Sequence, residues 1–219
     1  MADLQEEPKR HFYKALEQLE KCGCTIVEID LSILKYSIAT YYIVATAEAS
    51  TNLARFDGIR YGHRSARAKT LEQVYDYSKR EGFGAEVRRR ILLGTYVLSA
   101  GYQDAYYKQA GRVRGKIIEA FNTAFEHCDV IATPTSPLAA FPIGSIQDPL
   151  QMYLQDIYTI GVNLAYLPGI SVPCGFAEPK LPLGLQLIGQ RREDPLVCRI
   201  ADAYEKATRF TEEIPQAYG

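Results

Sequence analysis

Two charged residues stand where charge is unusual, and each could bind a small polar molecule. Asp156 is the only charged residue between Pro149 and Ala177. Its carboxylate must find a partner or lie at a polar surface, because burying an unpaired charge is strongly unfavourable. A helix end or a surface face would explain Asp156 without any ligand. The alternative is a carboxylate that faces a polar pocket.

Arg90 is the second such residue, and it ends a run of three arginines. Successive helix residues are about 100° apart, so the three cannot share one face. Arg90 falls in the apolar arc of Val87 and Val97, whereas Arg88 and Arg89 fall outside it. An inward guanidinium can pair with a carboxylate through two hydrogen bonds. An inward arginine and an inward aspartate could therefore hold the α-carboxylate and the α-ammonium of a free amino acid.

A third polar group follows helical spacing in the first half of the chain. Glu48, Asn52 and Arg55 form one stripe, which we interpret as a structural row of hydrogen bonds. Tyr41 and Tyr42 precede it in a stretch without charged residues. A buried tyrosine usually hydrogen-bonds through its hydroxyl, so these two side chains are also candidates for a polar site.

Composition excludes several classes of function. The 219 residues carry a net charge of −1, which argues against a whole-chain electrostatic grip on nucleic acid or an anionic membrane. The N-terminus is polar and acidic, so we expect no signal peptide, and we expect no transmembrane helix. The odd number of cysteines favours free thiols, and the scattered histidines predict no metal site. The phosphate-binding GxxxxGK[ST] pattern, GxGxxG and GxSxG are all missing.

Periodicity predicts the elements that must position these residues. Apolar runs bounded by Gly and Pro indicate buried strands, and 3.6-residue patterns indicate helices, so the fold class is α/β. Four strands are few for so many helices, which suggests a larger sheet whose partner strands are missing. Residues 58–68 carry no core pattern and predict an exposed loop. We expect helices over 8–22, 33–57, 70–80, 84–100, 102–127, 149–164 and 194–209, and strands over 24–31, 129–137, 169–175 and 184–189.

Long stretches of the sequence resemble a known family. They are YYIVATAEASTNLARFDGIRYG (41–62), residues 81–114, DPLQMYLQDIYTIGVNLAYLPGISVPCGF (148–176) and PLGLQLIG (182–189). They resemble the C-terminal half of the A subunits of glutamyl-tRNA(Gln) amidotransferases, which are amidase-signature enzymes. The resemblance covers about residues 9–210. It implies the C-terminal half of the amidase-signature fold, a mixed β-sheet core covered by helices, with residues 1–219 as a single partial domain.

The resemblance also implies an activity and partners. Such A subunits release ammonia from glutamine, and the B subunit of the same enzyme uses ATP and Mg to amidate Glu-tRNA(Gln). A small C subunit binds to the A subunit. The implied partners are therefore glutamine, the amidotransferase subunits B and C, and Glu-tRNA(Gln) through the complex, without a membrane. The chain itself would need no cofactor and would work in the cytoplasm or an organelle matrix.

The family's catalytic residues cannot be carried over to this chain. Its nucleophilic Ser, bridging cis-Ser and Lys lie upstream of the matching region, and Ser136 and Ser171 lack the Gly/Ser-rich context. We therefore assign no catalytic residue and expect the isolated chain to be inactive on glutamine. By position in the matching motifs, the resemblance assigns the glutamine pocket to Tyr41, Arg90 and Asp156.

Two other interpretations stay open. The chain could be the C-terminal half of another amidase that acts on a different amide. It could also be a non-catalytic fragment that binds partners, and the exposed loop would then be the place to look, through Arg60, His63, Arg64 and Arg67.

Overall fold

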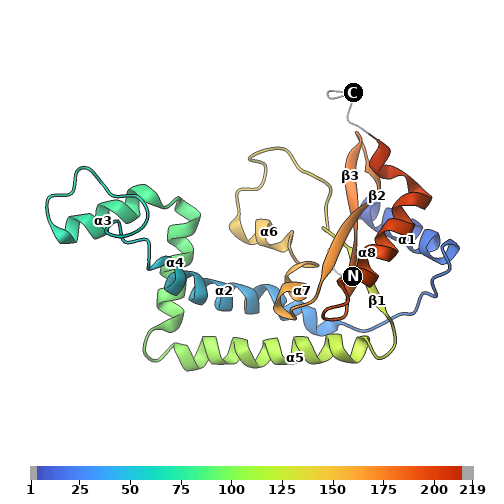
Figure 1. The fold of residues 1–219 in the computed structure, drawn as a ribbon, viewed down its shortest axis with the longest axis horizontal. Helices are drawn as coiled ribbons and strands as arrows, with labels where there is room; N and C mark the ends of the chain where they lie inside the picture. The colour runs from blue at the N-terminus through green and yellow to red at the C-terminus, as the bar shows by residue number, and fades with distance from the viewer. Residues whose placement is uncertain (1–3, 214–219) are drawn as a thin grey trace. The chain divides into compact units, whose positions relative to one another are not determined.

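The computed structural model describes residues 4–213, and the chain divides into two compact units (Figure 1). The sheet unit is formed by the residues up to 38 and from 115 onward. The helical unit is formed by residues 39–114. Each unit is described by itself.

The sheet unit contains a three-stranded sheet with the order β1-β3-β2. Its strands are β1 (Val130–Pro134), β2 (Gly169–Ala177) and β3 (Leu181–Gly189). The α/β class is confirmed, as are the strands expected over 129–137, 169–175 and 184–189. We expected a mixed sheet, but both pairings among the described strands are antiparallel. A three-residue turn joins β2 to β3, and so short a connection permits only an antiparallel pair.

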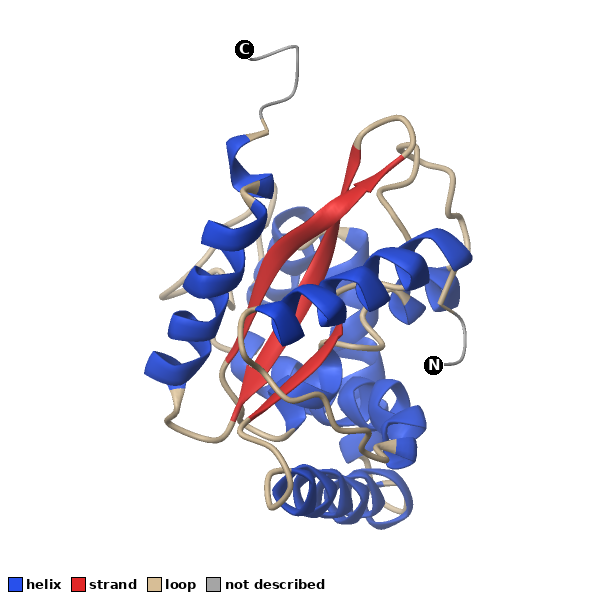
Figure 2. Ribbon diagram, turned by 90° about the vertical axis from the view of Figure 1, so that its right-hand side faces the viewer, coloured by secondary structure: helices blue, strands red, loops and turns tan. Residues whose placement is uncertain are grey.

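Two helices, α1 (Glu6–Lys21) and α8 (Asp194–Thr208), cover one face of this sheet (Figure 2). Alternate residues of β3 point toward them, as the two-residue period of a strand requires. These residues and their partners on the helices are almost completely buried, and they form the core of the unit. The core includes Leu183, Leu185 and Leu187 from β3, Phe12 from α1 and Tyr204 from α8.

The expected helix over 149–164 is wrong as a continuous element. The structure has two short helices there, α6 (Pro149–Leu154) and α7 (Ile160–Leu164). Asp148 caps the first, since its Oδ1 accepts a hydrogen bond from the Leu150 backbone N–H at 3.0 Å. The turn between the two helices contains Asp156, so this residue lies at an interruption and not on a helical face.

The expected strand over 24–31 is also wrong. This segment forms no strand, and the side chains of Ile26 and Val27 are exposed. The alternating pattern is present, but a strand also needs a neighbour to pair with, and the described sheet offers none to it. The segment leads into the short helix η1 (Ser32–Tyr36).

The helical unit follows the predicted pattern closely. Thr70 caps α3 as expected, because its Oγ1 accepts a hydrogen bond from the Gln73 backbone N–H at 3.2 Å. The expected helix over 102–127 begins with a π-helical turn. The elements of this unit are α2 (Ser37–Leu53), which begins just before it, α3 (Leu71–Gly82), α4 (Ala85–Leu98) and η2 (Gln103–Lys108). Helix α5 (Gln109–Ala124) begins in this unit and continues into the sheet unit, and η3 (Phe210–Glu212) lies near the end of the described chain. None of the helices in the described part of the chain has the length and apolar character needed to cross a membrane.

Candidate functional site: a polar cavity on the three-stranded sheet

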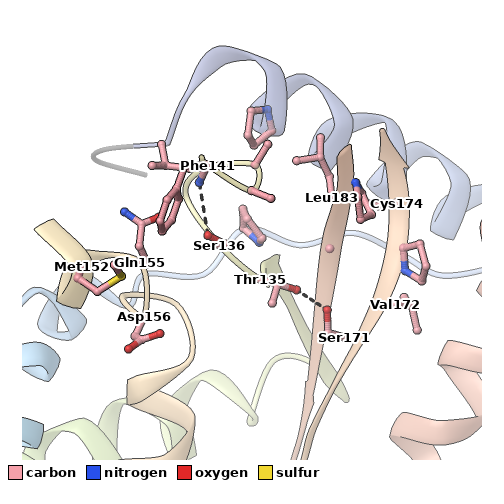
Figure 3. Close-up of a pocket in the computed structure, with 18 residues that line it drawn as sticks. Thr135, Ser136, Phe141, Met152, Gln155, Asp156, Ser171, Val172, Cys174 and Leu183 are labelled. Carbon is pink, nitrogen blue, oxygen red and sulfur yellow. Dashed lines mark hydrogen bonds between the residues drawn. The ribbon is translucent and has the colours of Figure 1, made fainter. Parts of the chain in front are cut away.

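A cavity of about 520 Å³ lies within the sheet unit, between the sheet and the α6–α7 turn (Figure 3). Its polar side chains come from the segment after β1, from β2 and from the turn between α6 and α7. They are Thr135, Ser136, Ser171, Gln155 and Asp156. Its apolar wall includes Leu138, Ala139, Phe141, Met152, Val172 and Leu183. A cavity of this size and mixed lining suits a small organic molecule.

Two hydroxyl groups meet on this side of the sheet. Thr135 Oγ1 and Ser171 Oγ lie 2.7 Å apart and share a hydrogen bond (Figure 3). Ser171 belongs to β2 and Thr135 directly follows β1, and Gly184 of the central strand β3 lies between their side chains. A Cβ on Gly184 would lie 2.5 Å from the Thr135 hydroxyl and 2.7 Å from that of Ser171. The glycine is therefore required for the hydroxyl pair to form.

Gln186 of β3, which pairs in register with Thr133 of β1 and Ser171 of β2, anchors the α6–α7 turn. Gln186 of β3 is buried, and its Nε2 donates to Thr133 Oγ1 at 2.8 Å and to the Tyr158 carbonyl at 2.9 Å. Tyr158 stands two residues after Asp156. Gln186 therefore fixes the turn that carries the aspartate against the same face of the sheet as the hydroxyl pair.

Asp156 lies on the cavity wall and is exposed to solvent. Its carboxylate accepts no hydrogen bond and forms no ion pair within residues 4–213. Exposure at an interrupted helix explains how a lone charge is tolerated in this apolar segment. Asp156 thus lies at the surface, as one of the two alternatives expected, and its carboxylate borders a cavity of mixed polar and apolar lining.

Arg90 belongs to the helical unit and is the least exposed of the three consecutive arginines, as the face argument predicts. Its Nε donates to Glu86 Oε1 at 3.0 Å, and this hydrogen bond is the main cause that raises the pKa of the guanidinium. The guanidinium also lies 5.8 Å from the ring centroid of Tyr42. Glu86 and Tyr42 thus hold Arg90 in place from two sides.

Tyr41 also lies in the helical unit, beside Tyr42. The two rings meet edge to face, with centroids 5.3 Å apart and planes at 88°. Arg90 therefore contacts the ring of Tyr42, and the ring of Tyr41 packs against Tyr42. The structure gathers Tyr41 and Arg90 in one unit and places Asp156 in the other.

The cavity offers no nucleophile–base pair among the described residues. Of the side chains that the structure describes, no Lys or His lines it, and the Asp156 carboxylate is hydrogen-bonded to neither Ser136 nor Ser171, so no general base contacts either serine. Burial raises the pKa of the Cys174 thiol to about 11, so this cysteine stays protonated near neutral pH. Within residues 4–213 no three His, Cys, Asp or Glu side chains gather in a way that could hold a metal ion.

Comparison with known proteins identifies the fold. The sequence profile of the Amidase family matches residues 1–198. The chain belongs to the amidase family. A curated relative from Protochlamydia amoebophila, named as the A subunit of glutamyl-tRNA(Gln) amidotransferase, is 62% identical over 99% of this chain and 44% of its own length. A protein of the same name from Chlamydia pneumoniae is 50% identical over 98% of this chain and 44% of its own length.

A solved structure extends the match to three dimensions. The crystal structure of the glutamyl-tRNA(Gln) amidotransferase A subunit from Thermotoga maritima is 45% identical and superposes with a TM-score of 0.69. The match covers 93% of this chain and 39% of that one. The chain therefore spans less than half the length of these relatives.

The loop before α3 is exposed, as predicted, but most of its polar groups contact one another. Glu81 Oε1 accepts hydrogen bonds from Ser65 Oγ at 3.0 Å and from Arg67 Nε at 3.0 Å. Glu81 Oε2 lies 2.8 Å from His63 Nε2. These three contacts hold the pKa of Glu81 far below its usual range, at about 2. Two of the four residues proposed for partner binding, His63 and Arg67, thus belong to a structural cluster.

Sequence reasoning missed the hydroxyl pair. Ser171 was considered only as a nucleophile, and Thr135 was not singled out. The pair depends on the strand order, because its two residues are 36 positions apart. The signal that could have found it is Gly184, since a glycine inside an apolar strand often marks a close approach.

Proposed function

We propose that this chain is the substrate-binding part of a glutamine amidase of the amidotransferase A-subunit type. The observation that carries the proposal is a substrate-sized cavity with a solvent-facing carboxylate, Asp156, and no Lys or His beside its hydroxyls among the described residues. Such a cavity can bind a substrate, but the described residues around it supply no activated nucleophile. The chain spans 44% of the relatives named as amidotransferase A subunits, so the nucleophile would come from the polypeptide that makes up the rest of that length.

Each assigned residue has a role that its surroundings support. The Asp156 carboxylate binds the α-ammonium group of glutamine, and Arg90 binds the α-carboxylate. Within the described residues the contact of Arg90 with Glu86 uses Nε, so both terminal nitrogens can make a bidentate pair. Tyr41, whose ring packs against that of Tyr42, adds a further hydroxyl to the binding residues.

The remaining functions belong to the assembled complex. The ammonia released from glutamine would pass to the partner B subunit, which uses ATP and Mg to amidate Glu-tRNA(Gln), and the C subunit would bind the chain that contains these residues. This chain would contact the tRNA only through the complex and would hold no cofactor. We place the complex in the cytoplasm or an organelle matrix and treat residues 1–219 as one partial domain.

The test is ammonia release from glutamine by the chain alone and after co-expression with the missing part of the P. amoebophila protein. We expect no release by the chain alone and measurable release by the complemented pair. Activity of the chain alone would overturn the proposal, because it would require a nucleophile within these residues. An apolar amide that competes better than glutamine would instead indicate another amidase specificity.

Two variants test the residue roles in the complemented pair. Arg90→Ala and Asp156→Asn should each lower kcat/KM for glutamine by about 10- to 100-fold, since each removes a charge that pairs with a charged group of the substrate. Arg89→Ala is the matched control, because Arg89 is exposed and also contacts Glu86, at 2.8 Å. Equal losses in Arg89→Ala and Arg90→Ala would contradict the assigned role of Arg90.

A further inference from the structure

The Thr135–Ser171 hydroxyl pair has no place in the function described so far, although the sheet is built to form it. Outer strands of a three-stranded sheet lie about 9.5 Å apart, so hydroxyls from them do not normally meet. Here the two oxygens lie 2.7 Å apart because the central strand has no side chain at Gly184. The Thr135 backbone N–H also donates to the Gly184 carbonyl at 2.9 Å, which fixes the segment after β1 in position.

The pair can both donate and accept hydrogen bonds toward the cavity. Each hydroxyl has one O–H and two lone pairs, and one O–H is used within the pair. One O–H and several lone pairs remain, and both residues line the cavity. A carboxylate can only accept and an ammonium group can only donate, whereas a primary carboxamide does both. Of these three groups, only the carboxamide can both donate a hydrogen bond to the hydroxyl pair and accept one from it.

We infer that the hydroxyl pair binds the side-chain carboxamide of the substrate. This inference rests on the proposed function and adds a second contact point to it. Asp156 on the wall of the same cavity would hold the amine, and the hydroxyl pair would hold the amide. The cavity would then select a molecule that carries both groups and would discriminate against analogues that lack the amide.

The test compares glutamine with norleucine, which has a similar length and the same α-amino acid group but no amide. With the chain complemented by the part of the P. amoebophila protein that it does not match, glutamine binding is measured as the KM for ammonia release, and norleucine binding as its inhibition constant in the same assay. The variants are Thr135→Val and Ser171→Ala, which remove one hydroxyl each. Thr208→Val is the control, because it makes the same change in α8, on the other face of the sheet.

Each hydroxyl variant should weaken glutamine binding by about 3- to 10-fold, the usual effect of one lost neutral hydrogen bond. Norleucine binding should stay unchanged, so the preference for glutamine should fall. A purely structural role would weaken both ligands equally, and that result would overturn the inference. Unchanged binding of both ligands would also overturn it.

The two proposals can fail separately. If the complemented protein with no substitution binds no glutamine, the proposed function and the inference both fall. If it binds and hydrolyses glutamine while the hydroxyl variants keep the full preference over norleucine, only the inference falls. Gly184→Ala gives an independent check, since a Cβ there would push the hydroxyls apart and should reduce the preference as the two variants do.

Discussion

The cavity of the sheet unit and the Glu81 cluster of the helical unit both bring polar side chains together, but different interactions hold them in place. The Glu81 cluster consists of Glu81, His63, Ser65 and Arg67. In the cavity, Thr135 and Ser171 are positioned by strand register, while an apolar core on the other face holds the sheet. In the cluster, His63 and Arg67 are positioned by the charge of Glu81 itself.

This difference decides which region can bind a ligand. The hydroxyl pair keeps unused hydrogen-bonding capacity, and the Asp156 carboxylate has no partner among the described residues. Glu81 already accepts from Ser65 and Arg67 and contacts His63. Polar groups held by apolar packing remain available, whereas polar groups that hold one another are occupied. The cavity is therefore the better candidate for ligand binding, and the cluster is a structural support.

The largest effect should come from the apolar core that supports the cavity. Leu185 is fully buried between the sheet and its covering helices. Leu185→Ala should lower the free energy of unfolding of the sheet unit by about 2–5 kcal/mol, the usual range for a truncated core leucine. Urea denaturation monitored by circular dichroism would measure it. Leu150→Ala, at a leucine with a relative exposure of 58%, should change stability little; equal losses would contradict the assignment of the core.

A smaller loss is expected where two helices of the helical unit touch. A Cβ on Gly94 of α4 would overlap the Thr46 carbonyl of α2. Gly94→Ala should therefore destabilise this unit by about 1–3 kcal/mol through overpacking. The control is Gly111→Ala in α5, where a Cβ meets nothing within 4 Å. That control should stabilise the helix by up to about 1 kcal/mol, so opposite signs in thermal denaturation are expected.

The Glu81 cluster should respond locally. Glu81→Gln removes the charge that gathers Ser65 and Arg67, so the loop before α3 should loosen. Hydrogen exchange of the Ser65 amide, which donates to Ser78 Oγ at 3.1 Å, should accelerate by at least about tenfold. Glu72→Gln on the same helix should leave this rate unchanged. Unchanged exchange in Glu81→Gln would mean that backbone packing alone holds the loop.

The same contrast explains what the sequence could predict. Periodicity located the helices, the hairpin strands and the less exposed face of Arg90, because apolar packing leaves a repeating signal. It failed for residues 24–31, where the strand pattern is present but no described strand pairs with it. The pattern of a segment does not show whether another strand lies beside it to pair with.

The site was predictable only in part, for the same physical reason. Asp156 stood out because its charge contradicts its surroundings, and the structure places it on the cavity wall. The contact between Thr135 and Ser171 depends on strand order and on a missing side chain at Gly184, which local patterns do not encode. The Glu81 cluster likewise joins a loop to α3. In the sequence, its charged residues cannot be distinguished from those of an ordinary solvent-exposed surface.

The smallest expected effect is a difference in pH dependence: the stability of the sheet unit and that of the Glu81 cluster should fall in different pH ranges. His11 of α1 has a pKa below its usual 6.5, mainly because of burial, with Arg10 and Lys14 adding repulsion. The Cys174 backbone and Glu7 act in the opposite direction without cancelling the shift. Protonation therefore favours the unfolded chain, so the free energy of unfolding should be constant above pH 6.5 and fall below it.

Glu81 should act in a different pH window. Because its pKa is lowered from 4.5 to about 2, its stabilising contacts should persist down to pH 4.5 and be lost as the pH falls through about 2. Between about pH 6.5 and 5 only the sheet unit should weaken, while exchange of the Ser65 amide, corrected for its intrinsic pH dependence, stays constant. His11→Gln should abolish the loss of stability, and His127→Gln should retain it. A loss that survives in His11→Gln would assign the acid sensitivity to another group and remove this distinction between the two regions.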